Sequence, residues 1–172
     1  MSMLSKKIVT QARELWEQDR ALDAGKLIFD SIPTESQPRW AARILTLVVD
    51  RTGLKSKPVL HVIQIAQSAQ TWSLARGAFD DVRHEVLALS RVQARGEHAS
   101  LRMSVLHLAE KVAKVTFNAT DPLAKYDKDS GWKMATCLKD VLDLLKDEPF
   151  SAIAWRALNS LDSDDDGRNV KR

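Results

Sequence analysis

Apolar residues recur along this chain at every third or fourth position, which is the spacing that lines one face of an α-helix. The clearest run is spaced by alternating steps of four and three and consists of Ala75, Phe79, Val82, Val86 and Leu89. Almost no segment alternates apolar and polar residues with the period of two that a half-buried strand requires. The pattern predicts an all-α protein.

Proline residues divide this pattern into about eight helices. Ser5 is expected to precede the first helix, and Pro33 stops the second one because proline cannot donate the backbone hydrogen bond that a helix interior needs. Pro38, Pro58 and Pro149 stand near first helical turns, where the missing N–H costs nothing. The prolines therefore predict helix starts and ends rather than kinks.

Other expected boundaries depend on glycine and on capping residues. Gly53 and Gly96 are expected to end the third and fifth helices in the left-handed conformation that glycine adopts without strain. Asp129 or Ser130 is expected to cap the seventh helix with a side-chain oxygen. The eighth helix is expected to carry Ile153, Trp155 and Leu158.

The sixth helix is apolar on two sides. One side carries Leu101, Val105, Leu108, Val112 and Val115, and the other carries Leu106, Ala113 and Phe117. A helix that contacts apolar neighbours on both sides is typical of the centre of a bundle. Its surplus of apolar surface also leaves open that copies of the chain associate through it.

The length and composition favour one folded domain. The chain has 172 residues, of which 44% are hydrophobic and 28% are charged, as in ordinary globular proteins. We expect residues 1–161 to form a single all-helical domain, and residues 162–172 to form a flexible tail that is first acidic and then basic. The domain is predicted to be an irregular helical bundle or a short stack of helical hairpins, which the pattern does not distinguish.

The compartment is inferred from features that the sequence lacks. No apolar run approaches the roughly 18 residues that a membrane-spanning helix needs, and the first residues do not show the apolar segment of a signal peptide. The single cysteine, Cys137, cannot form an internal disulfide and falls beside an apolar stripe, where it behaves as a small core residue. We therefore expect a cytoplasmic protein that does not bind the membrane.

No segment has the residue types and spacing of a known catalytic motif. The sequence contains no Gly-x-Ser-x-Gly elbow, no glycine-rich phosphate loop and no His-Glu-x-x-His pair. The nearest approach to metal chemistry consists of Asp80, His84, His107 and Glu110, which are expected instead to lie on solvated helix faces. We predict no catalytic residue, no metal site and no cofactor, so a non-enzymatic role is favoured over catalysis.

Arginine residues gather on one side of the fifth helix. They are Arg76, Arg83, Arg91 and Arg95. A basic face of this kind is what contact with phosphates needs, and it supports an alternative function as a nucleic-acid-binding accessory protein. The net charge of +3 is low for that role, and no aromatic residues interleave with the arginines to stack on bases.

The favoured contact surface lies where the longest irregular segment, about residues 118–130, meets the seventh helix. It contains Tyr126, Asp127, Asp129 and Trp132. Tryptophan and tyrosine often anchor protein interfaces, and long loops in compact domains frequently carry function. The leading hypothesis is a non-enzymatic protein–protein interaction module, of adaptor or inhibitor type, with an unidentified protein partner.

Overall fold

A computed structural model describes residues 4–68, 72–92, 95–121 and 129–160. Within these segments the chain forms helices and no strands, which confirms the predicted all-α class. The helices are α1 (Lys6–Glu17), α2 (Ala21–Phe29), α3 (Gln37–Thr52), α4 (Lys57–Ser68), α5 (Trp72–Arg91), α6 (Glu97–Thr120), α7 (Asp129–Leu145) and α8 (Glu148–Asn159), with a short 3₁₀ helix at Thr34–Ser36. No helix of the described segments is both long enough and apolar enough to cross a bilayer.

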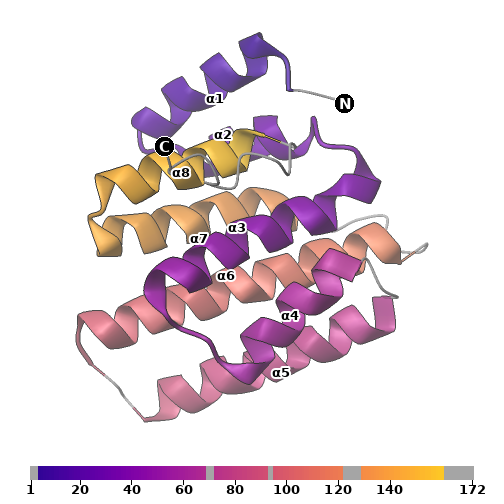
Figure 1. Cartoon of the computed structure of the whole chain (residues 1–172), viewed down its shortest axis with the longest axis vertical. Helices are drawn as coiled ribbons and strands as arrows, with labels where there is room; N and C mark the ends of the chain where they lie inside the picture. Colours follow the sequence, from indigo (N-terminus) through magenta and orange to yellow (C-terminus); the bar gives the residue numbers. More distant parts are fainter. Residues whose placement is uncertain (1–3, 69–71, 93–94, 122–128, 161–172) are drawn as a thin grey trace, which may run out of the picture.

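The helices form two layers (Figure 1). In one layer α1, α2, α7, α6 and α5 lie side by side in that order, and in the other α8, α3 and α4 cover one side of it. Because α7 packs between α2 and α6, neighbours in space are not always neighbours in sequence. The arrangement is therefore a two-layered bundle rather than a stack of consecutive hairpins.

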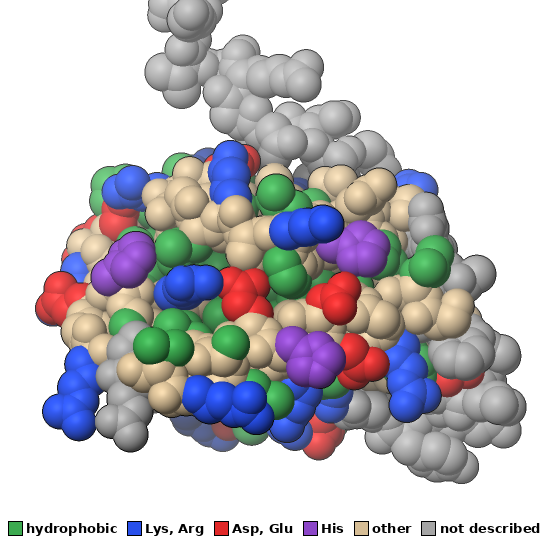
Figure 2. Space-filling model, turned by 90° about the horizontal axis from the view of Figure 1, so that it is seen from below, with side chains coloured by type: hydrophobic (Ala, Val, Ile, Leu, Met, Phe, Trp, Pro, Cys, Tyr) green, Lys and Arg blue, Asp and Glu red, His purple; other side chains and the backbone are tan. Residues whose placement is uncertain are grey.

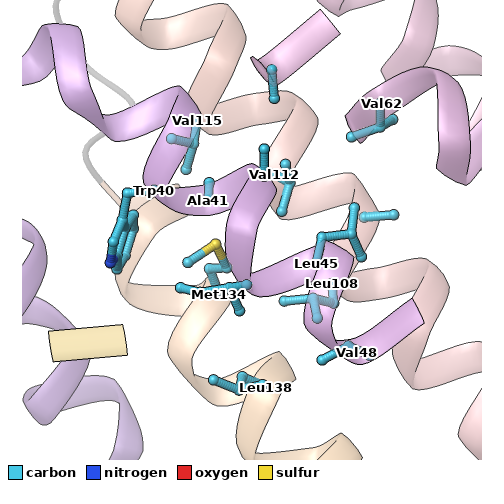
Figure 3. Close-up of a cluster of buried hydrophobic side chains, with 14 of the residues drawn as sticks. Trp40, Ala41, Leu45, Val48, Val62, Leu108, Val112, Val115, Met134 and Leu138 are labelled. Atoms are coloured by element: carbon cyan, nitrogen blue, oxygen red, sulfur yellow. The ribbon is translucent and has the colours of Figure 1, made fainter. Parts of the chain in front are cut away.

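The core lies between the two layers and is centred on α6. This helix packs against α3, α4, α5 and α7. Figure 3 shows Trp40, Ala41, Leu45 and Val48 of α3 beside Leu108, Val112 and Val115 of α6, with Met134 and Leu138 of α7 nearby. Both apolar sides of α6 thus include residues buried inside the chain, as the pattern predicted.

Several predicted helix ends are confirmed. The Ser5 hydroxyl accepts a hydrogen bond from the Ile8 N–H at 3.3 Å and so caps α1. Gly53 follows α3 with φ 70°. At the start of α8 the carboxylate of Asp147 accepts from the Phe150 N–H at 3.0 Å, and it also accepts from Nε of Arg51 at 2.6 Å. The contact between Arg51 and Asp147 thus ties the end of α3 to the start of α8.

Other expected positions are wrong. The fifth helix ends at Arg91, before Gly96, because Gly96 with φ 106° precedes α6 instead. Ser130 does not stand in front of α7 but is buried in its first turn, where its hydroxyl accepts from Nδ2 of Asn118 at 3.3 Å. Helix α8 does carry Ile153, Trp155 and Leu158, but its buried face is formed by Phe150, Ala154, Trp155, Ala157 and Leu158, and Ile153 is 42% exposed.

Helices α2 and α7 approach each other so closely that each needs a glycine at the contact. A Cβ atom on Gly25 would lie 2.5 Å from the Cβ of Ala135 and 3.0 Å from the carbonyl oxygen of Trp132. A Cβ atom on Gly131 would overlap the ring of Phe29. The two glycines thus form a reciprocal contact in which each helix accommodates atoms of the other.

We predict that Gly25→Ala and Gly131→Ala each lower the free energy of unfolding by about 1–3 kcal/mol, because the added methyl group overpacks the contact. Gly77→Ala is the matched control, since a Cβ there meets nothing within 4 Å. Alanine at this mid-helix position should raise the stability by about 0.5–1 kcal/mol. Urea unfolding of the three variants measures the difference, and equal stability of Gly131→Ala and Gly77→Ala would contradict the close contact.

Candidate functional site

The side chain of Trp132 is held against α2. Trp132 lies in the first turn of α7 and is partly buried against the core. Its indole Nε1–H donates to Oδ1 of Asp30 at 3.1 Å, and Nζ of Lys26 lies 4.8 Å from the ring centroid. A hydrogen bond at the ring edge and a cation over its face together fix the orientation of the indole.

The structure brings two residues of the predicted contact surface together. Asp129 is exposed at the first position of α7, one turn before Trp132, and its carboxylate lies 3.7 Å from Nζ of Lys133. Tyr126 and Asp127 lie outside the described residues. The described part of the prediction therefore consists of Asp129 and Trp132 on a single helical turn.

Helix α2 adds residues that the sequence interpretation missed. Leu22, Lys26 and Asp30 follow one another at four-residue intervals along α2 and its end, and Leu22 is 46% exposed. The spacing was visible in the sequence, but nothing there indicated that α7 lies alongside. We call the surface formed by Leu22, Lys26, Asp30, Asp129 and Trp132 the α2–α7 patch.

The four arginines of the predicted basic face are all exposed, but Arg95 lies beyond the end of α5 at Arg91, so its placement on the fifth helix is wrong. One of them, Arg83, makes an ion pair with Glu110 of α6 at 3.5 Å. Figure 2 shows the molecule from below, with α5 on the near side. In its described part, lysine and arginine side chains are interspersed with acidic and histidine side chains. The face therefore carries mixed charges rather than a band of positive charge.

Glu110 is buried, and the prediction that it faces solvent is wrong. Only 5% of its side chain is exposed, while Nδ1 of His107 lies 2.9 Å from its Oε2. Burial alone would raise the pKa of the Glu110 carboxyl, but the hydrogen bond with His107 and the charges of His107, Lys111 and Arg83 together lower it. Because a carboxylate only accepts hydrogen bonds, Nδ1 of His107 is the donor.

Cys137 and Asp140 on α7 lie close enough to this pair to feel its charges: Glu110 acts on the pKa of Cys137, and His107 acts on the pKa of Asp140. Burial raises the pKa of the Cys137 thiol to about 11, against the lowering effect of Lys111. Burial, followed by the charge of Asp143, raises the pKa of Asp140. A thiol that is protonated at neutral pH is a weak nucleophile.

Metal-assisted catalysis needs three or more ligands in one place. Within the described segments no group of three His, Cys, Asp or Glu side chains is positioned to hold a metal ion. Asp80 and His84 of α5 are thus not brought together with His107 and Glu110 in such a group. The contact between His107 and Glu110 is an internal hydrogen bond of the bundle.

A cavity of about 200 Å³ lies between the α3–α4 connection, α5 and α6. Its polar lining residues are Lys55, Ser56, Glu85, His98 and Arg102. The sequence interpretation did not assign these residues to a site, because they come from three separate segments.

In comparisons with known proteins, no family model matches this sequence, and neither a curated protein nor a solved structure shows significant similarity to it.

We predict that Glu110→Gln lowers the free energy of unfolding by about 1–3 kcal/mol at pH 7, the range for a hydrogen bond to a charged group. The pKa of Glu110 is lowered in the folded protein, so its carboxylate stabilises the fold above the ordinary value of 4.5. That contribution is lost as the pH falls through the lower folded pKa. Urea unfolding between pH 7 and pH 3 should show the two proteins converging in acid.

Glu17→Gln serves as the control for this series. Glu17 pairs with Arg13 at 2.8 Å, but both side chains are more than 60% exposed. Its removal should cost less than about 0.5 kcal/mol at any pH. A Glu110→Gln effect as small as this, or one that grows in acid, would show that the buried carboxylate does not stabilise the fold.

We predict that Cys137 of the folded protein reacts slowly with thiol reagents. A pKa of about 11 in place of 9.0 reduces the thiolate fraction at pH 8 by roughly 100-fold, and the rate follows the thiolate. The labelling rate with iodoacetamide is compared between the native protein and protein unfolded in urea. Equal rates would mean that the thiol is neither buried nor shifted.

Proposed function

We propose that this chain is a non-enzymatic protein-binding module of adaptor or inhibitor type, and that its contact surface is the α2–α7 patch. The observation that supports the proposal best is the fixed orientation of Trp132, whose indole is held by Asp30 at 3.1 Å and by Lys26 at 4.8 Å. Tryptophan is enriched among interface residues that dominate binding energy. An anchor that is already ordered loses little conformational entropy when a partner binds.

The composition of the patch resembles that of a protein interface. Leu22, one turn before Lys26 on α2, adds an exposed apolar side chain at 46% exposure. Lys26, Asp30 and Asp129 place charges of both signs around Leu22 and Trp132. Interfaces commonly combine an apolar centre with a polar rim, so the partner is expected to offer a small apolar depression flanked by both charges.

Nucleic-acid binding through the arginines of α5 has less support. Arg83 is already paired with the buried carboxylate of Glu110, and the exposed acids Asp80 and Asp81 lie on the same helix. A phosphate backbone would have to compete with Glu110 for Arg83, and the carboxylates of Asp80 and Asp81 would repel it. This alternative is tested within the same experiment.

The test is quantitative affinity capture from lysate of the protein's source, with Leu22→Glu compared against Leu60→Glu. These leucines are 46% and 45% exposed, on α2 and on α4 in the opposite layer. We expect Leu22→Glu and Trp132→Ala to reduce enrichment of a protein partner by at least about tenfold. Leu60→Glu should leave it unchanged, and circular dichroism confirms that each variant is folded.

Two results would contradict the proposal. If Leu22→Glu and Trp132→Ala are folded and retain full capture, the α2–α7 patch is not the contact surface. If nuclease treatment removes the enrichment, and Arg91→Glu removes it as well, the arginine face of α5 binds nucleic acid instead.

A further inference from the structure

Helix α1 is held at the edge of the bundle by few buried residues. It lies at the outer end of its layer, where α2 is its main neighbour (Figure 1). Within α1 only Ala12 is buried, while Leu15 and Trp16 are half-buried against the core. Trp16 also packs on Trp155 of α8, with ring centroids 5.2 Å apart. A small apolar contact surface therefore joins α1 to α2 and α8.

The connection from α1 to α2 contains a backbone conformation that glycine normally supplies. In residues 18–20 the Arg20 N–H donates to the carbonyl of Leu15 at 2.9 Å, and the Asp19 N–H donates to the carbonyl of Trp16 at 3.1 Å. These are the two hydrogen bonds of a Schellman motif, whose left-handed residue is usually glycine. Here that residue is Asp19, with φ 63°. Because a side chain disfavours this conformation, the turn is strained.

The side chain of Asp19 does little to offset this strain. It is 84% exposed, and its carboxylate lies 3.6 Å from Nζ of Lys139. An ion pair with so exposed a partner contributes little to stability. The strain is therefore released when α1 moves away from the bundle, and little is lost at the hinge itself.

The connection to the other terminal helix, α8, also contains a left-handed residue without being as easily opened. Lys146 has φ 51°. Helix α8, however, buries Phe150 and Leu158, and Nε1 of Trp40 donates to the carbonyl of Leu158 at 2.9 Å. Of the two terminal helices, α1 is thus the one that combines a strained connection with a small buried surface.

From these features we infer that α1 exchanges between two copies of this chain, so that each α1 packs on α2 and α8 of the other copy. A second copy carries an identical α1, so the exchanged dimer restores the contacts that opening removes, apart from those of the hinge. A short strained hinge favours such an exchange, and the dimer fraction rises with protein concentration. The inference does not depend on the role of the α2–α7 patch.

The experiment replaces Asp19 by two residues with opposite backbone preferences. Asp19→Gly permits the left-handed turn without strain, whereas Asp19→Ala opposes it and favours a continuous helix through residues 18–20. Both variants lose the ion pair with Lys139, so the backbone is the difference between them. Analytical ultracentrifugation of the full chain, equilibrated at up to about 1 mM, gives the dissociation constants of the dimers. We expect the Asp19→Ala dimer to be at least about tenfold tighter than the Asp19→Gly dimer, since each dimer contains two hinges.

A control variant and a mixed dimer identify the exchange itself. Lys146→Ala places the same strain before α8 and should leave dimerisation as in the wild-type protein. Isotope-labelled and unlabelled Asp19→Ala chains are then mixed, and filtered NMR spectra select contacts between different chains. We expect contacts between Trp16 of one chain and Trp155 of the other, because these rings meet wherever α1 is docked. Circular dichroism confirms that each variant is folded.

Three results would overturn the inference. The first is an Asp19→Ala protein that stays monomeric over the whole concentration range. The second is an equal dissociation constant for the Asp19→Ala and Asp19→Gly dimers, since the hinge would then have no role. The third is a dimer in which Trp16 contacts Trp155 of its own chain only, because closed monomers would then associate without exchanging α1.

Discussion

The contact between α2 and α7 is the constraint on which the arrangement of this bundle depends. The two helices come from distant parts of the sequence, and they approach closely because Gly25 and Gly131 have no side chains. Phe29 covers Gly131 and also packs on Trp40 of α3, with ring centroids 5.9 Å apart. One ring therefore links α2, α7 and α3. A second aromatic contact among the described residues, between Trp16 and Trp155, joins α1 to α8.

The same contact determines where the candidate interface lies. The carbonyl of Trp132 faces Gly25, so the backbone of α7 is brought down onto α2 at that turn. The indole of Trp132 then lies within reach of Lys26 and Asp30. These two residues follow Gly25 on the exposed side of α2 and at its end. A requirement of packing thus produces an ordered, partly exposed tryptophan. An interface anchor built in this way depends on the fold and is not a property of a loop alone.

Local features of the sequence predicted the helices well, because periodicity and capping are local. Pro33, Gly53 and Ser5 mark helix ends through the backbone chemistry of single residues. Gly96 shows the limit of this reasoning, since a positive φ fits the end of one helix and the approach to the next equally well. Glu110 shows a second limit. A carboxylate at the edge of an apolar stripe is exposed or buried depending on partners, and Arg83 becomes its neighbour only once α5 packs on α6.

The pairing of α5 with α6 places two largely buried carboxylates in different surroundings. Two acid–base pairs cross this interface in opposite senses: Arg83 of α5 meets Glu110 of α6, and Glu85 of α5 meets Arg102 of α6. Both oxygens of Glu110 are engaged, by Arg83 and by His107. Glu85 has no counterpart of His107, so one oxygen remains without a donor. An unpaired buried oxygen costs free energy that the first pair avoids, so the two pairs do not contribute equally to the contact between α5 and α6.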